Sequence, residues 1–249
     1  MQTMVFMPIL ALSIIGVIHS WTHKRQQALV MPTVAQVIGL HYKQDAGVFV
    51  SHLPKKVLPE RGVQLGKHHV TALLGSHEFQ MSELSVVTGS KGENTLFRGI
   101  AASFPNRTPL PAFFLFQDRK TRTGAIVPRE LSTDGLHHLR DVTSARRTYG
   151  IWTSSPLAVE PPALSIVVDC LLRLEERLGQ GYELYSASSS GKELHLLLSY
   201  NRDLFRVGGT FQTEARLFKH VQAAMKDLNI PLTLAQALIE AEAVASAKS

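Results

Sequence analysis

Cysteine is almost absent from this chain of 249 residues, because Cys170 is the only one. A disulfide within the chain is therefore excluded, and a reducing compartment suits the protein. Valines and leucines surround Cys170 in the sequence. Since a free cysteine usually packs as a small apolar side chain, we predict that Cys170 is buried and is not a nucleophile.

Aromatic and charged residues are also sparse, at 7% and 18% of the sequence. The hydrophobic content of 45% is nevertheless high enough to exclude a chain that is disordered throughout. No aromatic-rich RNA motif and no helix-turn-helix is legible, so we expect no nucleic-acid partner. The net charge of +6 comes with three basic clusters, at Lys55-Lys56, at Arg119-Lys120 with Arg122, and at Arg140 with Arg146-Arg147. These clusters predict a solvated cationic face, with anionic lipid headgroups or a protein partner as the alternatives.

Charge is missing altogether from residues 4–21, which are almost entirely apolar. Such a run spans about 27 Å as a helix, which is just enough for a thin hydrocarbon core. Trp21 stands at its end, and His23, Lys24 and Arg25 follow. The positive-inside rule then predicts an anchor over residues 1–23 that crosses the cytoplasmic (inner) membrane once, with the N-terminus outside and the C-terminal domain in the cytoplasm. A signal peptide and a buried or interfacial helix are the alternatives.

Behind this anchor we predict an α+β domain in four parts. Residues 24–47 form a connector whose helix ends at Gly39, where glycine suits the left-handed turn. Residues 48–124 form an antiparallel β-meander, because short apolar or alternating runs are separated by turn residues. Residues 125–145, with their proline and glycine, are expected to be a linker.

The last part, residues 146–249, reads as a layer of helix, β-hairpin and helix. Pro161-Pro162 opens the first helix, and residues 182–186 and 193–200 form the hairpin. A second helix is predicted from Thr210 to Leu228, with Pro231 ending it and Thr233 capping a last helix.

Histidines raise the question of a metal site. His68, His69 and His77 lie close together with Glu78, and His137 adjoins His138. Zinc needs ligands that converge at about 2 Å. Adjacent residues of a strand point to opposite faces, so we predict that these histidines hold no metal.

No catalytic or cofactor motif stands out elsewhere. The loop from Thr88 to Thr95 contains Gly and Lys, but not in the order of a phosphate-binding loop, and it reads as a hairpin turn. Ser154, Ser155 and the run 186–190 lack the Gly-x-Ser-x-Gly pattern of a nucleophile elbow. We therefore predict no catalytic, metal or cofactor-binding residues.

Two stretches of the chain nevertheless resemble a known family. Residues 83–87 read as a strand that opens with the acidic Glu83. After a polar turn, residues 95–100 read as a second strand and contain the run Leu96-Phe97-Arg98-Gly99. This pattern resembles the bacterial DUF3137 family of membrane-associated proteins of uncharacterised function. The resemblance covers roughly residues 35–240. It implies the architecture and the membrane setting, but it carries over no active site.

Three functions stay open at this point. The first is a membrane-anchored, non-catalytic accessory or scaffold protein, a subunit of a membrane protein complex. The second is a peripheral lipid- or ligand-sensing module at the anionic membrane surface, which the basic clusters favour. The third is an enzyme, and scattered His, Ser and Asp residues are the only feature of the sequence that favours it.

Overall fold

A computed structural model describes most of the chain behind the predicted anchor. The described residues are 25, 27–75, 77–89, 94–106, 110–117, 133–144, 147–179, 181–200, 202, 204–205 and 213–247, and the side chains of His77 and Leu217 are not among what is described. The predicted transmembrane anchor over residues 1–23 lies outside these ranges.

The chain divides into two compact units. Unit 1 comprises Met1–Tyr42 and Asp203–Asn229, and unit 2 comprises Lys43–Arg202 and Ile230–Ser249. The two units are described in turn.

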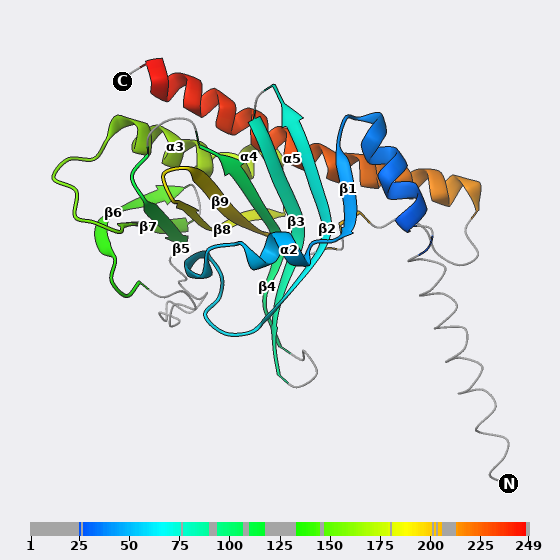
Figure 1. Ribbon diagram of the computed structural model, residues 1–249, viewed down its shortest axis with the longest axis horizontal. Helices are drawn as coiled ribbons and strands as arrows, with labels where there is room; N and C mark the ends of the chain where they lie inside the picture. The colour runs from blue at the N-terminus through cyan, green and yellow to red at the C-terminus, as the bar shows by residue number, and fades with distance from the viewer. Residues whose placement is uncertain are drawn as a thin grey trace, which may run out of the picture. The chain divides into compact units, whose positions relative to one another are not determined.

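Unit 2 is built on a sheet whose strand order is β1-β2-β3-β4-β9-β8-β5-β7-β6 (Figure 1). The pairings from β2 to β6 are all antiparallel. The strands are β1 (His41–Asp45), β2 (Val63–Leu74), β3 (His77–Thr88), β4 (Asn94–Pro105), β5 (Phe113–Gln117), β6 (His137–Ser144), β7 (Arg147–Thr153), β8 (Tyr182–Ser189) and β9 (Glu193–Tyr200).

The predicted β region and the predicted C-terminal hairpin belong to one sheet, not to two layers. β2, β3 and β4 form a meander, as expected, but the hairpin of β8 and β9 lies between β4 and β5. β9 is buried along Leu194–Leu198 on both of its faces. An apolar strand of this kind belongs in the centre of a sheet, which is why the hairpin joins β4 and β5.

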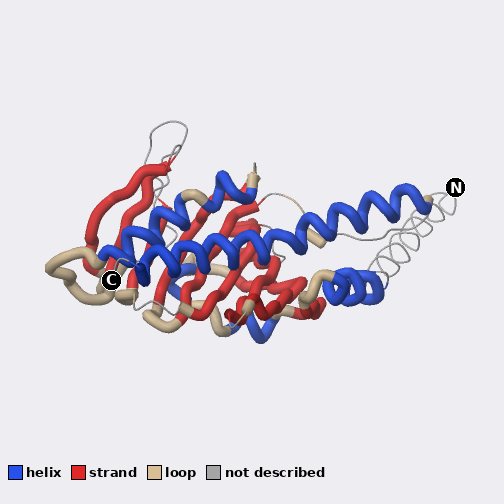
Figure 2. The backbone as a smooth tube through the Cα atoms, turned by 90° about the horizontal axis from the view of Figure 1, so that it is seen from above, coloured by secondary structure: helices blue, strands red, loops and turns tan. Residues whose placement is uncertain are grey.

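Short helices cover the two faces of this sheet. α3 (Pro162–Leu172), α4 (Leu174–Leu178) and the second half of α5 (Glu214–Ala247) lie on one face, called here the helical face (Figures 1 and 2). α2 (Gly47–Ser51) and the 3-10 helix η1 (Lys55–Val57) lie on the opposite face. A cluster of buried residues forms under these two short helices, and Phe97, Phe116, Tyr185 and Leu197 of the sheet contribute to it.

α5 corrects the prediction of two separate helices at the C-terminus. It runs from Glu214 to Ala247 without a break, and Pro231 lies inside it. A proline within a helix removes one backbone hydrogen bond and costs about 3 kcal/mol. Burial compensates here, since Pro231 itself is buried and an apolar stripe continues beyond it, made of Leu234, Ala235, Ala237, Leu238, Ala241 and Ala245.

By length and composition, α5 is also the helix of the described residues that meets the criteria for crossing a membrane. Its second half, however, packs inside unit 2. The Cys170 thiol donates a hydrogen bond to the Ala237 carbonyl oxygen at 3.2 Å, and Arg177 pairs with Glu240 at 2.7 Å. These contacts fit a core helix of the folded domain.

The predicted linker over residues 125–145 is wrong in its second part, because residues 137–144 form strand β6. β6 pairs with β7 at the end of the sheet order. Its residues are exposed or half-buried throughout, so the apolar alternation that identifies a half-buried strand is missing. Residues 118–132 lie outside the described part of the chain.

Unit 1 contains a helix over residues 27–37 and the first half of α5. The predicted end of the connector helix is confirmed, since Gly39 follows it with a φ of +76°. Pro32 lies inside this helix. Met31 and Ala35 are fully buried, as are Ala224 and Leu228 of α5. The two helical segments therefore each bury one apolar side.

Candidate functional site

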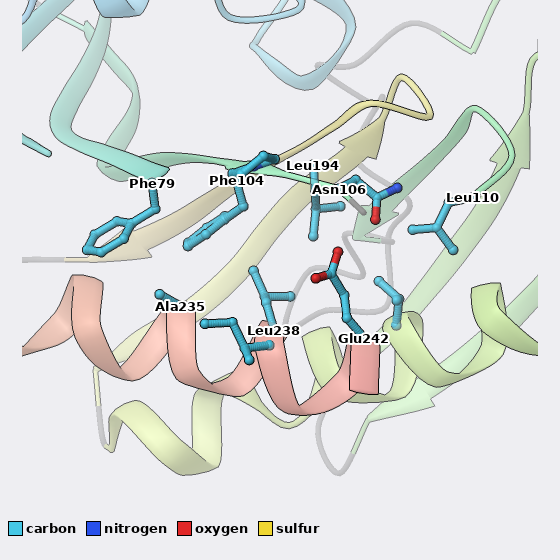
Figure 3. Close-up of a pocket in the computed structure, with 11 residues that line it drawn as sticks. Phe79, Phe104, Asn106, Leu110, Leu194, Ala235, Leu238 and Glu242 are labelled. Atoms are coloured by element: carbon cyan, nitrogen blue, oxygen red, sulfur yellow. The ribbon is translucent and has the colours of Figure 1, made fainter. Parts of the chain in front are cut away.

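An apolar pocket lies on the helical face of unit 2, between the sheet and α5 (Figure 3). Phe79, Phe104 and Leu194 line it from the sheet, and Leu238 lines it from α5. Phe79 and Phe104 stack with ring centroids 5.9 Å apart. Figure 3 shows the polar groups of Asn106 and Glu242 near each other, with Leu110 beyond them. Apolar atoms make up almost all of the pocket surface, which suits an apolar ligand or an acyl chain.

The volume of this pocket limits what it holds as it stands. The cavity measures about 20 Å³, which is room for roughly one water molecule. Ligand pockets for drug-sized molecules measure about 300 Å³ or more. The pocket is therefore a packed seam between helix and sheet, and a larger ligand requires α5 to move away from Phe79 and Phe104.

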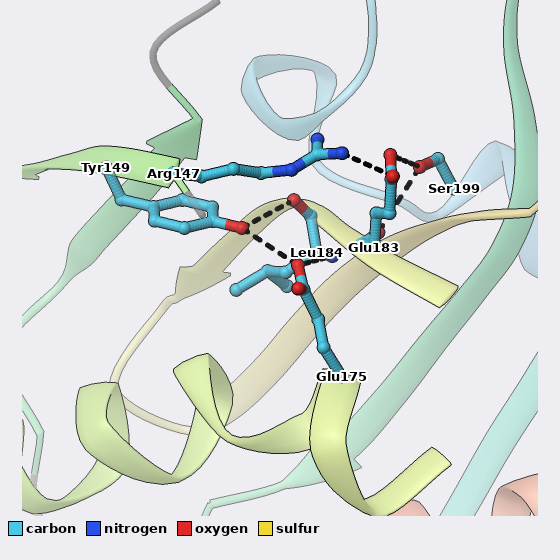
Figure 4. Close-up of polar contacts among 6 residues, drawn as sticks. All are labelled: Arg147, Tyr149, Glu175, Glu183, Leu184 and Ser199. Atoms are coloured by element: carbon cyan, nitrogen blue, oxygen red, sulfur yellow. Dashed lines mark hydrogen bonds and ion pairs between the residues drawn. The ribbon is translucent and has the colours of Figure 1, made fainter. Parts of the chain in front are cut away.

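A buried tyrosine forms polar contacts on the helical face (Figure 4). Tyr149 of β7 is fully buried, and its hydroxyl lies 3.1 Å from Glu175 Oε1 and 3.2 Å from the Leu184 carbonyl oxygen. The backbone N–H of Leu184 also donates to Glu175 Oε1, at 3.1 Å. Burial, together with the neighbouring Glu175 carboxylate, raises the pKa of Tyr149. The hydroxyl is thus a neutral donor that fastens α4 to β8.

A second polar contact in the same figure is a pair of charges. Arg147 of β7 forms an ion pair with Glu183 of β8, and Ser199 Oγ lies 3.4 Å from Glu183 Oε2 (Figure 4). Arg147 belongs to one of the predicted basic clusters. Its charge is paired with a carboxylate of β8, on the other side of β5, so it stabilises the sheet.

Two more described members of the basic clusters have partners within unit 2, whereas Lys55 is exposed. Lys56 donates to the Asp134 carbonyl oxygen at 2.9 Å and lies 5.6 Å from the centroid of the Phe114 ring. Arg140 makes a two-bond pair with Glu160, at 2.6 and 2.9 Å. Hydrogen bonding to Glu160 raises the pKa of Arg140. The prediction of one cationic face therefore does not fit Lys56, Arg140 and Arg147, whereas Arg119, Lys120, Arg122 and Arg146 lie outside the described residues.

The predicted histidine group is divided between the two faces of the sheet. His68 Nε2 lies 3.7 Å from Glu83 Oε2, whereas His69 stacks on Phe49 at 5.1 Å and approaches Gln80 Oε1 at 3.2 Å. Glu83 and Gln80 are three residues apart on one strand and so point to opposite faces. A bulge between Lys67 and Val70 accompanies this arrangement, and His68 has a φ of +57°.

The second histidine pair is also engaged in local contacts. His138 Nε2 lies 2.8 Å from Asp141 Oδ1, and its ring meets the Trp152 ring edge-on at 4.8 Å. Within the described part of the chain, no group of three or more His, Cys, Asp or Glu side chains is placed to hold a metal ion.

Cys170 behaves as the sequence predicts. It is partly buried, its thiol donates to the Ala237 carbonyl oxygen, and burial raises the pKa of the Cys170 thiol. A raised pKa keeps the thiol protonated and weakens it as a nucleophile.

The serines of the sequence analysis serve turns and packing. Ser186 Oγ donates to the Val57 carbonyl oxygen at 2.7 Å, which ties β8 to η1. Ser189 and Ser190 accept backbone hydrogen bonds in the turn that leads to β9. Thr88 pairs with Asn94, so the predicted hairpin joins β3 and β4, with residues 90–93 outside the described part.

The residues that carry the family resemblance have structural roles in the sheet. Arg98 Nη2 lies 4.0 Å from Glu83 Oε1, so the acidic residue of one strand pairs with the basic residue of the next. The Phe97 ring packs against Tyr185 at 4.9 Å. A side chain at Gly99 would collide with the backbone carbonyl of Leu198 in β9. The motif thus contacts residues of β3, β8 and β9 from its place in β4.

Unit 1 has a polar centre of its own, called here the Phe205 clamp. The Phe205 N–H donates to Asp227 Oδ2 at 2.9 Å, and Gln27 Nε2 donates to the Phe205 carbonyl oxygen at 2.7 Å. Gln27, Phe205 and Asp227 are all buried. The clamp joins the helix over residues 27–37 to the first half of α5 through one backbone unit.

Comparisons with known proteins add little to this geometry. No protein-family model matches the sequence, and no curated protein matches it. A comparison with solved structures matches the chain to the crystal structure of the mycobacterial trehalose monomycolate transport factor A, TtfA, with a TM-score of 0.42 and 6% sequence identity, over 84% of this chain and 96% of that chain. A TM-score this low does not establish a shared fold or function. The resemblance to the DUF3137 family stays a prediction.

His195 of β9 is one of the buried polar residues that sequence reasoning missed. It is 6% exposed, and on the neighbouring strands it pairs in register with Ser103 and Ser188. Burial lowers the pKa of His195, although Glu193 opposes the effect. No described residue makes a hydrogen bond to His195 Nδ1, which makes this a place for an ordered water. A histidine within the leucine run of β9 was the signal in the sequence.

Proposed function

We propose that this protein is a membrane-anchored, non-catalytic accessory or scaffold protein. Residues 4–21 would hold it in the cytoplasmic membrane, and the globular part would lie in the cytoplasm as a subunit of a membrane protein complex. Membership of the DUF3137 family is part of the proposal. The observation that supports it is the Phe205 clamp, which fastens the segment directly behind the predicted anchor.

The clamp matters because of where it lies in the chain. The predicted anchor ends at residue 23, and Gln27 of the clamp follows four residues later. Gln27, Phe205 and Asp227 are joined by buried hydrogen bonds, one of them to a carboxylate, and such bonds are costly to break. The helix behind the anchor is thus fixed to α5 and is not a loose tether, as expected of a protein that holds its surface in a defined place at the membrane.

The test is recovery of a partner from native membranes. The full-length protein, tagged at its C-terminus and produced at native level, is crosslinked in intact membranes, purified in mild detergent and identified by mass spectrometry. We expect one membrane protein to co-purify in constant ratio. Asp227→Ala should lower that ratio, whereas Glu214→Ala, an exposed acidic residue of the same helix, should not. Recovery of the monomer only, or from the soluble fraction, would contradict the proposal.

A second candidate is the lipid- or ligand-sensing module. The pocket lined by Phe79, Phe104 and Leu238 favours it, since an apolar surface suits the acyl chain of a lipid. Because the volume of the pocket is small, it can hold such a ligand only if α5 moves. Native mass spectrometry of the detergent-purified full-length protein would show a bound lipid, and Leu238→Trp, which fills the seam, should remove it. Retention of the same lipid in that variant would exclude this pocket.

A further inference from the structure

Both helical segments of unit 1 expose apolar residues. The exposed residues of these two segments are together called here the outer side of unit 1, and they include Leu29, Val37, Phe218 and Met225. No Asp, Glu, Lys or Arg occurs between Arg25 and Lys43. Within this stretch, the helix over residues 27–37 exposes Leu29 at 67% and Val37 at 77%. Single exposed apolar residues are normal on a protein surface, but an uncharged helix with two of them directly behind a predicted membrane anchor is not an ordinary water-facing helix.

The first half of α5 combines exposed apolar and basic residues in a regular pattern. Phe218 and Met225 are 62% and 42% exposed and lie seven residues apart, so they share one side of the helix. Lys219 and Lys226 follow each of them by one position, are also exposed, and form a parallel basic row. An apolar row beside a lysine row is the pattern of helices that lie in the interface of a bilayer.

The charge of this surface has the sign that anionic lipids attract. Over residues 213–229, the exposed cations are Arg216, Lys219 and Lys226, and the exposed acidic residue is Glu214. Asp227 does not oppose them at the surface, because it is buried and accepts the hydrogen bond from the Phe205 N–H. The lysines therefore face the surroundings without a matching number of carboxylates.

The position of unit 1 in the chain favours the bilayer as its partner. Gln27 follows the predicted end of the anchor, at residue 23, by four positions. Such a stretch reaches at most about 14 Å, so helix 27–37 begins close to the headgroups if the anchor spans the membrane. The Phe205 clamp then brings the first half of α5 to the same level, since it joins the two helices.

We propose that the outer side of unit 1 lies in the headgroup region of an anionic bilayer, with Phe218 and Met225 inserted and Lys219 and Lys226 against lipid phosphates. This inference rests on the proposed membrane anchoring, and it adds a second, reversible attachment. The anchor fixes the distance of unit 1 from the bilayer, and this contact fixes the orientation of unit 1.

The experiment measures the depth of single fluorescent probes. Cys170→Ala removes the one native cysteine, and Met225→Cys, labelled with an environment-sensitive dye, reports on the helix. The full-length protein is reconstituted into vesicles of phosphatidylcholine with or without phosphatidylglycerol, containing lipids with a quencher in the acyl chain. We expect strong quenching in the anionic vesicles, with a labelled Leu29→Cys giving the same result. A labelled Val159→Cys, which is 82% exposed in unit 2, is the control and should not be quenched.

The lysines are tested in the same assay. Removing one positive charge near an anionic surface weakens the contact about five-fold, so Lys219→Gln with Lys226→Gln should shift the docked fraction about 25-fold toward the undocked state. Lys192→Gln, an exposed lysine of unit 2, should have no effect. Unchanged quenching in the double variant, or quenching no greater than at Val159→Cys, would overturn the inference.

Failure of the inference and failure of the anchor give different results. If the anchor prediction is wrong, an alkaline wash releases the protein from the vesicles, whatever the probes show. If only the inference is wrong, the protein stays with the vesicles after the wash, and the probe at residue 225 remains in water.

Discussion

Units 1 and 2 bury polar groups for different purposes. In unit 2, Tyr149, Glu175 and Ser186 fasten helices to a sheet that already has large apolar surfaces on both faces. In unit 1, the Phe205 clamp supports a small helical unit that leaves Leu29 and Phe218 exposed. The comparison teaches that a few buried hydrogen bonds are secondary where a large core exists, and central where it does not.

The largest expected effect is a loss of stability in unit 2, caused by a substitution in its sheet. Gly99→Ala places a methyl group against the Leu198 carbonyl, where β4 and β9 meet. Because backbone cannot yield as a side chain can, we expect a loss of about 3 kcal/mol or more in the free energy of unfolding. Denaturant unfolding followed by circular dichroism measures it.

Gly75→Ala is the matched control for that substitution. Gly75 has a φ of +62°, and an added methyl group would meet nothing within 4 Å. Only backbone strain is expected there, of about 1 kcal/mol. Equal losses at both glycines would show that the close approach of β4 and β9 is not what restricts residue 99.

The next largest effect is expected in unit 1 and not in unit 2. Asp227→Ala leaves the buried Phe205 N–H without its carboxylate acceptor, at a cost of about 2 kcal/mol. Hydrogen exchange followed by mass spectrometry should show faster exchange over residues 27–37 and 213–229, with β4 and β9 unchanged. Slower or unaltered exchange in unit 1, or equal acceleration in the two units, would remove the distinction between them.

A smaller effect tests the polar contacts of unit 2. Tyr149→Phe removes the donor to Glu175 and Leu184, and we expect a loss of about 1 kcal/mol near pH 8. The pKa of Tyr149 is raised in the folded state, mainly by burial. The native hydroxyl therefore stabilises fully below the pKa of an unfolded tyrosine, about 10, and this stabilisation falls as the pH rises above it.

The stability difference between the native protein and Tyr149→Phe should therefore shrink between pH 8 and pH 11. Ser199→Ala, which loses a hydroxyl that does not titrate in this range, should show no such change relative to the native protein. A difference that grows at high pH would contradict the neutral, buried hydroxyl.

The smallest effect concerns His195. Burial lowers its pKa in the folded state, so its contribution to stability is present above the pKa of an unfolded histidine, about 6.5, and is lost as the pH falls below it. His195→Gln should therefore lose less stability than the native protein between pH 7.5 and pH 5. Ser188→Ala, in register with His195 on the neighbouring strand β8, is the control, because its hydroxyl does not titrate in this range, and it should lose as much stability as the native protein.

Prediction from the sequence worked where local chemistry decides the structure. The hairpin between β3 and β4, the helix that begins at Pro162, and the end of the connector helix at Gly39 were all legible, because each depends on turn residues or on a short apolar pattern. β6 was not legible, since a strand with little burial lacks the apolar alternation that marks strands.

The candidate sites were predictable to a lesser degree. The opposite directions of His68 and His69 followed from the geometry of a strand, and the packing role of Cys170 followed from its apolar neighbours. The seam beside Phe104 and Leu238 and the Phe205 clamp did not follow, because each joins residues that are distant in the sequence. No local pattern records which distant segments will meet.

By itself, the sequence determined the class of the fold, the positions of most turns and the apolar residues available for burial, since these depend on neighbours along the chain. Only the tertiary structure decided that β8 and β9 lie between β4 and β5 and that α5 continues through Pro231. The physical reason is the same in both cases. Burial against distant segments outweighs a local preference of a few kcal/mol, and it depends on contacts that arise only when the chain is folded.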